Sequence, residues 1–434
     1  MRISVVGCGY LGAVHAACMA ELGHDVVGID VDEHKVAELS AGRPPFFEPG
    51  LPEVLARGVA SGRLRFTSDM AEAAGARVHF VAVGTPQTAG SHAADLRYVD
   101  AAVTGLLPHL GDGDLVVGKS TVPVGTAARL ADLVRDSSPA DLAWNPEFLR
   151  EGFAVADTLS PDRFVYGVRP GPEGDRATGL LDEVYATPLT SGMPRIVTDY
   201  ATAELVKVSA NAFLATKISF INAMAEIAEA TGADVTQLAD AIGHDARIGR
   251  RFLNAGLGFG GGCLPKDIRA FQARADELGL DSLAFLADVD AVNLRRRQRV
   301  VDLAGELVGT VEGAQVAVLG VAFKPDSDDV RDSPALDVAR SLHEQGALVT
   351  VFDPEATETA RRVAPELRYA ADVDEALTGA DVVLVLTEWA QFRALDPASV
   401  AGLVRGRRIV DGRNVLDAST WRAAGFEFRG LGRP

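Results

Sequence analysis

The sequence Val5-Val6-Gly7-Cys8-Gly9-Tyr10-Leu11-Gly12 places three glycines in a Gly-x-Gly-x-x-Gly pattern. The apolar run Ile3–Val6 is typical of a buried strand, and the alanine-rich stretch Gly12–Leu22 predicts a helix. In such a strand–turn–helix unit, glycines let the backbone approach a pyrophosphate, which binds at the positive end of the helix. The pattern therefore predicts a dinucleotide site near the start of this sequence.

The acidic residue Asp30 strengthens this interpretation. It ends the next apolar run, Val26–Asp30, eighteen residues after Gly12. That spacing is close to the distance of about 20 residues expected for a carboxylate that binds the ribose hydroxyls. A carboxylate here repels a 2′-phosphate, so the predicted cofactor is NAD rather than NADP. The simpler alternative is a tight turn followed by an aspartate that merely ends a strand.

The N-terminal part of the chain continues to alternate short β-branched runs with alanine-rich amphipathic runs. Strands are predicted at Val78–Val83, Leu115–Lys119 and Leu142–Asn145, and helices at Glu33–Ala41, Leu51–Ala60 and Val99–Leu107. This alternation predicts a parallel, doubly wound α/β sheet.

Two loops follow predicted strands of this sheet. Val83-Gly84-Thr85-Pro86 follows one strand, and Lys119-Ser120-Thr121-Val122-Pro123 follows another. Ligands of open α/β sheets bind beyond the carboxyl ends of the strands, so we expect both loops to line the nicotinamide side of the site. Either segment taken alone is also compatible with an ordinary turn.

The middle of the chain is helical. Thr198–Ala230 has almost no turn residues and predicts one helix of about 33 residues, which Thr198 or Asp199 can cap and which is about 50 Å long. A helix of that length bridges two domains or forms a dimer seam. A second helical region runs over Lys266–Val308 with a break near Gly279, and the glycine-rich segment Gly243–Gly262 between the two predicts a loop.

A second alternating region begins near Gly313, with strands predicted at Gln315–Leu319, Leu348–Phe352, Asp381–Leu386 and Arg408–Val410. The predicted fold class is α/β, with two doubly wound Rossmann-like domains joined by a long central helix and a helical dimerisation region. The expected domains are an NAD-binding domain over residues 1–197, a central helical domain with the catalytic loop over 198–310, and a second Rossmann-like domain over 311–434.

Composition excludes several classes of function. The 434 residues suggest about three domains, and 47% apolar with 24% charged residues is typical of a globular chain. The net charge of −18 repels nucleic acids and anionic lipid, and only 6% aromatic residues also disfavours a base-stacking surface. We therefore expect a small-molecule partner, no nucleic acid and no membrane insertion.

The three cysteines, Cys8, Cys18 and Cys263, are too few for a disulfide framework and form no Cys-x-x-Cys metal pair. No metal site is predicted, and a reducing cytoplasm is the natural location. Arg2 followed by the apolar stretch Ile3–Ala20 superficially resembles a secretion signal, but three glycines and His15 interrupt that stretch.

The segment Gly260-Gly261-Gly262-Cys263-Leu264-Pro265-Lys266-Asp267 has the features of a reactive centre. We expect a flexible glycine run to deliver one cysteine to a helix start, where Pro265 suits the first helical position. The positive helix end and Lys266 favour the thiolate, and Asp267 is a candidate proton handler or water orienter. The alternative is an inert buried cysteine, for which the surrounding glycines and Pro-Lys-Asp offer no explanation.

Other polar groups could join this cysteine. Lys207 and Asn211 are four residues apart on the long helix, so they share a face and can form an oxyanion site. Glu147 and Glu151, in Asn145-Pro146-Glu147-Phe148-Leu149-Arg150-Glu151-Gly152, follow a strand and are candidate general bases or helix-start charges.

The second sheet contributes Lys324 and Arg331 beyond the end of its first strand. Both occur in Phe323-Lys324-Pro325-Asp326-Ser327-Asp328-Asp329-Val330-Arg331, and both suit a phosphate or a carboxylate. For these two cations, as for Lys207 and Asn211, solvated surface residues are the alternative.

In this order the motifs resemble the UDP-glucose 6-dehydrogenase family along essentially the whole chain. The most specific are Asn145–Gly152, Gly258–Asp267 and Phe323–Pro334. The family oxidises the 6-hydroxyl of UDP-glucose to a carboxylate with two NAD in sequence, and the resemblance implies this activity, this cofactor and this substrate. It also explains the cysteine, because an alcohol dehydrogenase stops at the aldehyde unless a nucleophile captures it.

The resemblance implies a role for each reactive residue. Cys263 attacks the aldehyde to give a thiohemiacetal, whose oxidation gives a thioester that water cleaves. Lys207 and Asn211 correspond to the pair that stabilises the charged oxygen, Asp267 to a water-associated aspartate, and Glu147 to the base for hydrolysis.

It implies ligand contacts as well. The residues that match cofactor contacts are Lys35, Thr121, Glu151, Lys266 and Arg331, and Thr121 also contacts water. The residues that match substrate contacts are Phe148, Leu149, Arg150, Glu151, Lys207, Asn211, Phe252, Leu253, Asn254, Ala255, Gly256, Gly260 and Lys324. Arg413, in Asp411-Gly412-Arg413-Asn414, matches a substrate-side arginine, and Arg247 one that reaches the neighbouring subunit's substrate in a homodimer formed through the central helix.

The chain departs from the family pattern at two positions. Phe153 stands where the family has a small Ser or Thr, and Leu11 replaces a common valine. The bulk of Phe153 affects the expected packing beside Glu151, not the reaction.

Three other functions stay open at this point. GDP-mannose 6-dehydrogenases share the chemistry, although Thr387-Glu388-Trp389 and Asp411–Asn414 resemble the UDP-glucose branch. A two-electron hydroxyacid dehydrogenase could use Lys207 but has no need for Cys263. A non-enzymatic nucleotide-sensing module would need none of the reactive groups.

Overall fold

The computed structural model describes all residues 1–434, which form two compact units. The N-terminal unit comprises Met1–Ala210 and Ala273–Gly279, and the C-terminal unit comprises Asn211–Gln272 and Leu280–Pro434. The boundary falls within the long helix α9 (Tyr200–Thr231). None of the helices is both long and apolar enough to span a lipid bilayer.

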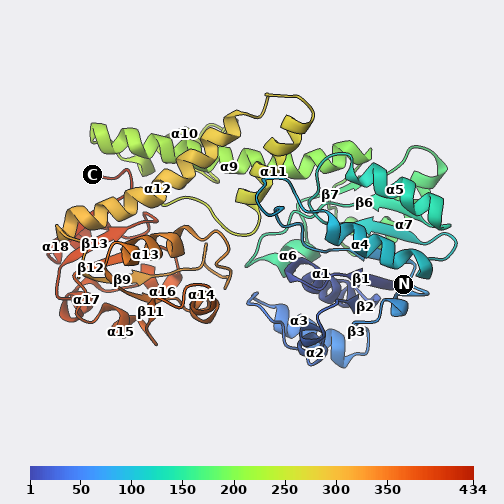
Figure 1. The fold of residues 1–434 in the computed structure, drawn as a ribbon, viewed down its shortest axis with the longest axis horizontal. Coiled ribbons are helices and arrows are strands. Elements are labelled where there is room, and N and C mark those ends of the chain that lie inside the picture. The colour runs from blue at the N-terminus through green and yellow to red at the C-terminus, as the bar shows by residue number, and fades with distance from the viewer. The chain divides into compact units, whose positions relative to one another are not determined.

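The N-terminal unit contains an eight-stranded sheet in the order β3-β2-β1-β4-β5-β6-β7-β8 (Figure 1). Every neighbouring pair is parallel except β6–β7, which is antiparallel. The strands are β1 (Arg2–Val6), β2 (Asp25–Ile29), β3 (Leu64–Thr67), β4 (Val78–Val81), β5 (Leu115–Gly118), β6 (Asp141–Trp144), β7 (Phe164–Gly167) and β8 (Arg195–Thr198).

The five strands predicted in this unit are β1, β2, β4, β5 and β6, and all five are present and mutually parallel. The strands β3, β7 and β8 were not predicted from the sequence. Of these, β3 and β8 are edge strands, and β8 is exposed at three of its four residues, so it lacks the buried apolar run that identifies a central strand. Asp30 follows β2 directly rather than ending it.

Helices cover both faces of this sheet, as a doubly wound fold requires. Alternate strand residues enter different cores: Val5 packs with residues of α1 and α3, whereas its neighbour Val6 packs with residues of α4 and α5. The helices of this unit are α1 (Tyr10–Glu21), α2 (Glu33–Ser40), α3 (Leu51–Ala60), α4 (Arg97–Leu106), α5 (Thr126–Ser137), α6 (Ala154–Leu159), α7 (Pro172–Val184) and α8 (Ala186–Thr190), with 3-10 turns at Met70–Ala73 and Leu107–His109.

The helical middle of the chain follows the prediction closely. The α9 helix has 32 residues, and the Asp199 carboxylate caps it by accepting the backbone N–H of Thr202 at 2.8 Å. It is followed by α10 (Val235–Gly243), α11 (Leu264–Glu277) and α12 (Phe285–Val308), and the predicted break near Gly279 separates the last two. Residues 244–263 form the predicted irregular loop.

The C-terminal unit contains a six-stranded parallel sheet in the order β11-β10-β9-β12-β13-β14. Its strands are β9 (Gln315–Leu319), β10 (Leu348–Phe352), β11 (Arg368–Tyr369), β12 (Val382–Val385), β13 (Arg408–Asp411) and β14 (Glu427–Gly430). The four predicted strands are β9, β10, β12 and β13. The analysis missed the two edges, because β11 has two residues and β14 alternates exposed and buried positions.

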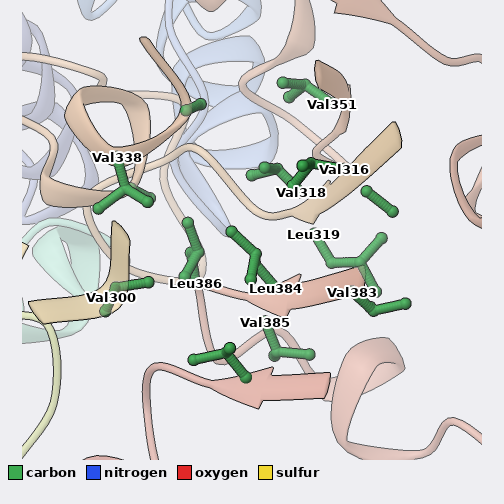
Figure 2. Packing of buried hydrophobic residues seen from close by; sticks show 14 of the residues in the cluster. Val300, Val316, Val318, Leu319, Val338, Val351, Val383, Leu384, Val385 and Leu386 are labelled. Carbon is green, nitrogen blue, oxygen red and sulfur yellow. The ribbon is translucent and has the colours of Figure 1, made fainter. Parts of the chain in front are cut away.

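One continuous core holds the C-terminal unit together. Figure 2 shows valine and leucine side chains of β9, β10 and β12 gathered with Val300 of α12 and Val338 of α13 (Pro334–Glu344). The remaining helices of this unit are α14 (Thr357–Val363), α15 (Val373–Leu377), α16 (Ala390–Arg393), α17 (Pro397–Leu403) and α18 (Ala418–Ala423).

In both sheets the strand order reverses beside the first strand. β1 lies between β2 and β4, and β9 lies between β10 and β12. Such a switch point opens a crevice at the carboxyl ends of the strands, where α/β proteins bind their ligands. The loops that follow β1 and β9 are therefore where each unit is built to hold a ligand.

Candidate active site

The structure explains each of the three glycines after β1 by a different feature of the loop. Gly7 has φ +89°, and a side chain on Gly12 would place its Cβ 1.7 Å from the carbonyl oxygen of Gly7. Gly9 differs, because a Cβ there would meet nothing within 4 Å. Gly9 precedes α1, and its residue type offers no side chain to cap that helix. The loop thus presents open backbone at a helix N-terminus, the arrangement that binds a pyrophosphate.

Asp30 lies beside this loop, as predicted. Its carboxylate accepts the Cys8 backbone N–H at 2.7 Å and that of Asp32 at 3.0 Å, and it pairs with Lys35 at 3.0 Å. The next residue, Val31, is 92% exposed. This pairing brings the predicted cofactor residue Lys35 to the same carboxylate, next to the glycine-rich turn.

The two loops predicted to line the nicotinamide side do meet. The Thr85 hydroxyl donates to the carbonyl oxygen of Thr121 at 2.8 Å, and the Ser120 hydroxyl donates to the carbonyl oxygen of Val83 at 2.6 Å. Gly84 and Pro86 are exposed beside Thr85. The loops after β4 and β5 therefore form one continuous rim at the carboxyl edge of the sheet.

A buried glutamate, Glu48, connects the glycine-rich loop to the Glu151 segment, and nothing in the sequence had singled it out. The Glu48 carboxylate, only 2% exposed, accepts the Tyr10 hydroxyl and the backbone N–H groups of Gly152 and Ala154, each of the latter at 2.6 Å. Burial, the hydrogen bond to Glu48 and the charge of Glu151 raise the pKa of Tyr10. Tyr10 therefore stays a hydrogen-bond donor, and the glycine-rich loop is tied to the residues around Glu151.

Glu147 is held by a buried lysine. Its Oε2 lies 3.0 Å from Lys119 Nζ, and its Oε1 accepts the backbone N–H groups of Phe148 and Leu149 at 2.8 and 3.0 Å. Burial opposes ionisation of Glu147, but the charge of Lys119 and these hydrogen bonds outweigh it, so the pKa of the carboxyl lies below its ordinary value. Glu147 is therefore an ionised, rigidly oriented carboxylate.

The rest of this segment gathers cations on an aromatic ring. Lys207 Nζ lies 5.6 Å from the centre of the Phe148 ring, and the guanidinium of Arg163 lies 3.8 Å from it. Arg150 pairs with Asp157 at 2.7 Å and stacks 5.0 Å from Phe153. The large residue Phe153, 52% exposed, is thus accommodated at the surface.

The reactive centre predicted in the C-terminal unit is assembled around Asp267. Cys263 is exposed just before α11, and the Asp267 N–H donates to its carbonyl oxygen at 3.0 Å, so the two residues are one helical turn apart. The Asp267 carboxylate is 3% exposed and accepts the Asn211 side-chain amide and Lys266 Nζ, both at 2.6 Å. An exposed thiol therefore stands beside a buried carboxylate, an amide donor and a cation.

The glycines before Cys263 correct one expectation. The run is not simply flexible, because a side chain on Gly260 would lie 2.2 Å from the carbonyl oxygen of Asp332, and one on Gly262 would lie 2.4 Å from the guanidinium of Arg331. Gly261 donates its N–H to the carbonyl oxygen of Arg331 at 2.9 Å. The glycines are needed for close approach, and they bring Arg331 against the residue before Cys263.

Arg413, which the resemblance places on the substrate side, binds three backbone carbonyl groups in the structure. Its guanidinium donates to the carbonyl oxygens of Leu386, Gly258 and Phe323 at 2.8, 3.0 and 3.0 Å. Burial lowers the pKa of Arg413, although Glu388 at 3.2 Å raises it. These bonds make Arg413 a tie between the catalytic loop and the loop that carries Lys324, whose Nζ lies 5.4 Å from the Phe323 ring.

The segment 252–256 has one unusual backbone conformation. Phe252 adopts φ +66°, which is rare for a bulky residue, and is 37% exposed. Leu253 and Ala255 are buried against α9 and α10, Asn254 accepts from Arg250 at 2.7 Å, and the Gly256 N–H donates to Asn222 at 2.9 Å. The anchored backbone thus presents an aromatic ring outward, and such strain is found at ligand sites.

Arg247 is a surface residue. Its side chain is 89% exposed and paired only with the nearby Asp245, at 2.6 Å. The other candidate residues divide between the two units. Of the residues the analysis missed, Lys119 had a detectable signal, a cation at the end of an apolar strand, whereas Glu48 had none.

Comparison with known proteins defines the class. Three parts of the chain match the UDP-glucose/GDP-mannose dehydrogenase family: its NAD binding domain over residues 1–188, its central domain over 201–295 and its UDP binding domain over 317–418. The chain belongs to this family of NAD-dependent oxidoreductases.

The most similar relatives include UDP-glucose 6-dehydrogenases. One from Rhizobium meliloti (strain 1021) is 43% identical over 443 residues, covering 100% of both chains. A solved UDP-glucose dehydrogenase from Pyrobaculum islandicum is 42% identical, with a TM-score of 0.91 over 100% of this chain and 98% of that one. A UDP-D-ManNAc dehydrogenase from Pyrococcus horikoshii is 26% identical, with a TM-score of 0.87 over 100% and 99%.

The residues of the N-terminal unit fit the cofactor that the family uses. Gly9 leaves open backbone before α1, as a pyrophosphate requires, and Asp30 stands at the end of β2, where ribose hydroxyls bind. The NAD binding domain of the family matches residues 1–188, which contain this loop and Asp30, whereas its UDP binding domain matches residues 317–418 of the C-terminal unit. NAD therefore binds the first sheet.

Proposed function

We propose that the chain is a four-electron sugar-nucleotide dehydrogenase that converts UDP-glucose to UDP-glucuronate. The observation that carries this proposal is the exposed thiol of Cys263, one helical turn before a buried carboxylate that also binds Asn211 and Lys266. A dehydrogenase that stops at the aldehyde has no use for a nucleophile. A family member that carries this group is built to continue to the acid.

The proposed reaction has four steps. The 6-hydroxyl loses a proton and a hydride to give an aldehyde, and the Cys263 sulfur adds to its carbonyl carbon to form a thiohemiacetal. Loss of a second hydride and a proton gives a thioester, and water then cleaves the carbon–sulfur bond to release the carboxylate and restore the thiol. Two NAD molecules in sequence would supply the acceptor for the two hydrides, each held in turn by the glycine-rich loop and Asp30.

Protein groups support the addition and hydrolysis steps of this proposal and contact the cofactor. Lys207 and Asn211, four residues apart on α9, stabilise the negative oxygen that forms when the thiol adds to the carbonyl. Asp267 orients water through its fixed carboxylate. Glu147, ionised and fixed by Lys119, accepts a proton from the hydrolytic water. Thr121, on the rim formed with Thr85, contacts water and cofactor.

For the substrate, the UDP binding domain supports a uridine diphosphate. Lys324 and Arg331 follow β9 and suit the diphosphate, and Phe252 offers an exposed ring on a strained, anchored backbone. The identity of the sugar needs a separate argument, because a relative with the same fold is a UDP-D-ManNAc dehydrogenase. The greater identity to UDP-glucose 6-dehydrogenases favours glucose.

We also propose that two copies associate through α9. Phe213, Phe220 and Ile227 recur every seven residues on that helix and are 66%, 51% and 59% exposed. Seven residues make two helical turns, so the three side chains form one apolar stripe, a feature that a second copy would cover. Arg247, extended from its own unit, is then available to the partner's substrate. The proposed division into domains remains 1–197, 198–310 and 311–434.

The test is the ratio of NADH formed to sugar nucleotide consumed, measured with UDP-glucose, UDP-N-acetylmannosamine and GDP-mannose. The proposal expects two NADH per UDP-glucose and much slower turnover of the others. One NADH per sugar would select a two-electron dehydrogenase, and turnover with GDP-mannose alone would replace the proposed substrate. NAD binding without turnover of any substrate would support a sensing module.

A further inference from the structure

The Asn293 side chain, on α12, makes a two-bond pair with the backbone of the catalytic loop. Its Oδ1 accepts the backbone N–H of Phe259 at 2.7 Å, and its Nδ2 donates to the carbonyl oxygen of the same residue at 3.0 Å. Asn293 is completely buried. Among the residue types, a carboxamide of this length offers both a donor and an acceptor without a charge, so it satisfies both buried backbone groups.

The neighbouring glycine is shaped around this contact. Gly258 has φ +103°, and a Cβ there would lie 2.3 Å from Asn293 Oδ1. The ring of Phe259 is buried with Ile268 of α11 and Leu286 and Val289 of α12. The backbone at Phe259 is therefore fixed by its ring on one side and by the Asn293 amide on the other, four residues before Cys263.

Two arginines also bind the backbone of this loop, and Arg413 donates to the carbonyl oxygen of Gly258 at 3.0 Å. Arg297, one helical turn after Asn293, adds a longer bond of 3.3 Å to the Phe259 carbonyl oxygen. Gly261 donates to the carbonyl oxygen of Arg331, and after that the thiol lies exposed at the start of α11. The Asn293 amide is the side chain that binds both the N–H and the carbonyl group of Phe259.

We propose that Asn293 is a positioning residue for the reaction: it sets the path of the loop Gly258–Gly262 and thereby the place of the Cys263 sulfur. It acts through the backbone of Phe259, which its side chain binds. Replacing it leaves two buried backbone groups of Phe259 without their main partners, so the loop shifts to find others. A displacement near 1 Å of a reacting group can lower a rate about 100-fold.

The experiment compares Asn293→Ala with Ser219→Ala. The Ser219 hydroxyl donates to the carbonyl oxygen of Val289 at 2.7 Å, so the control also removes one buried hydrogen bond between α9 and α12 but none to the loop. Amide hydrogen exchange of a peptide covering residues 258–263 is measured together with kcat and the KM for NAD. Asn293→Asp, which keeps the shape and the acceptor, is the second variant in case the alanine variant does not fold.

The expected result for Asn293→Ala is exchange at least tenfold faster in peptide 258–263 but not in β9 or β12, with kcat reduced at least tenfold. The KM for NAD should change by less than kcat, because the glycine-rich loop and Asp30, which fit its pyrophosphate and ribose, lie in the N-terminal unit. Asn293→Asp should move both quantities in the same direction by less, and Ser219→Ala should leave both unchanged. Unchanged exchange, or faster exchange with unchanged kcat, would overturn the positioning role.

The positioning role of Asn293 rests on the proposed function only where kcat is measured, because that measurement requires the chain to form NADH. If the wild-type chain forms no NADH, the proposed function fails, and the rate of Cys263 alkylation by iodoacetamide replaces kcat as the readout. That reagent is selective here, because Cys8 and Cys18 are completely buried. An alkylation rate changed at least threefold in Asn293→Ala, but not in Ser219→Ala, would support the positioning role, and equal rates would overturn it.

Discussion

Replacing Lys119 with methionine tests the electrostatics of the Glu147 segment. The Lys119 and Glu147 side chains are 4% and 17% exposed, with their charged atoms 3.0 Å apart. Lys119 Nζ also donates to the Asn145 side-chain oxygen at 3.1 Å. Methionine keeps much of the volume of lysine but leaves a poorly solvated carboxylate without its cation.

The size of the effect follows from this burial. Breaking a buried ion pair by removing one partner costs about 3–5 kcal/mol. The backbone N–H groups of Phe148 and Leu149 still bind the carboxylate, so we expect the lower end, about 3 kcal/mol, at pH 7.

The loss should depend on pH with a definite sign. In the wild-type chain the pKa of Glu147 lies below its ordinary 4.5, so its stabilising effect is present above pH 4.5 and is lost as the pH falls further. In Lys119→Met, the charge of Lys119 no longer outweighs the burial of Glu147, so burial raises the pKa of this carboxyl. The variant therefore loses stability as the pH rises through 4.5 and the buried carboxyl ionises. The difference between the two proteins should therefore shrink towards zero on acidification.

Urea unfolding followed by circular dichroism at pH 7, 5 and 4 measures this difference. Arg129→Met, which breaks a surface pair with Asp100, is the control and should show no comparable pH dependence. A loss in Lys119→Met that is equal at all three pH values, or no loss at pH 7, would show that the pair does not hold Glu147 in the way described.

Three further changes have defined outcomes. Asp30→Ala should lower the ratio of kcat/KM for NAD to that for NADP at least tenfold, because it removes both the ribose ligand and the repulsion of a 2′-phosphate; an unchanged ratio argues against that role. Glu48→Gln should raise the KM for NAD several-fold, because one of the bonds to Tyr10, Gly152 and Ala154 is lost, and steady-state kinetics equal to wild type would contradict it. His15→Leu should stabilise the chain by about 1–3 kcal/mol, since neither buried ring nitrogen has a partner, and more so below pH 6.5, because burial lowers the pKa of His15; urea unfolding that shows a loss of stability would refute this.

Local patterns in the sequence were enough to predict most of the fold. Buried central strands such as Val382–Val385 are continuous apolar runs, and the long helix over 200–231 contains almost no turn residues. Edge strands such as Arg195–Thr198 were not predicted, because this strand has only four residues and two apolar ones, Ile196 and Val197, both of them exposed.

The same distinction between local and distant contacts applies to the residues of the candidate site. The turn at Gly7–Gly12 and the cysteine before α11 depend on neighbours in the sequence, and both could be predicted. Glu48 binds residues about a hundred positions away, and Arg413 binds the carbonyl of Gly258, so nothing near either residue in the sequence indicates its partners. The family resemblance marked Arg413 as important, but only the structure shows its carbonyl contacts.

The central claim is that the sugar is bound covalently to Cys263 after the first oxidation and stays bound until water releases the acid. Glu147→Gln should slow hydrolysis, so mixing this variant with UDP-glucose and NAD, quenching in acid and mapping the peptides by mass spectrometry gives a direct test. The account predicts an added mass equal to the oxidised sugar nucleotide on the peptide containing Cys263 and none on those containing Cys8 or Cys18. The opposite result has two parts: the wild-type chain forms the acid, and the variant forms one NADH or more per active site but carries no such adduct. That result would contradict the account.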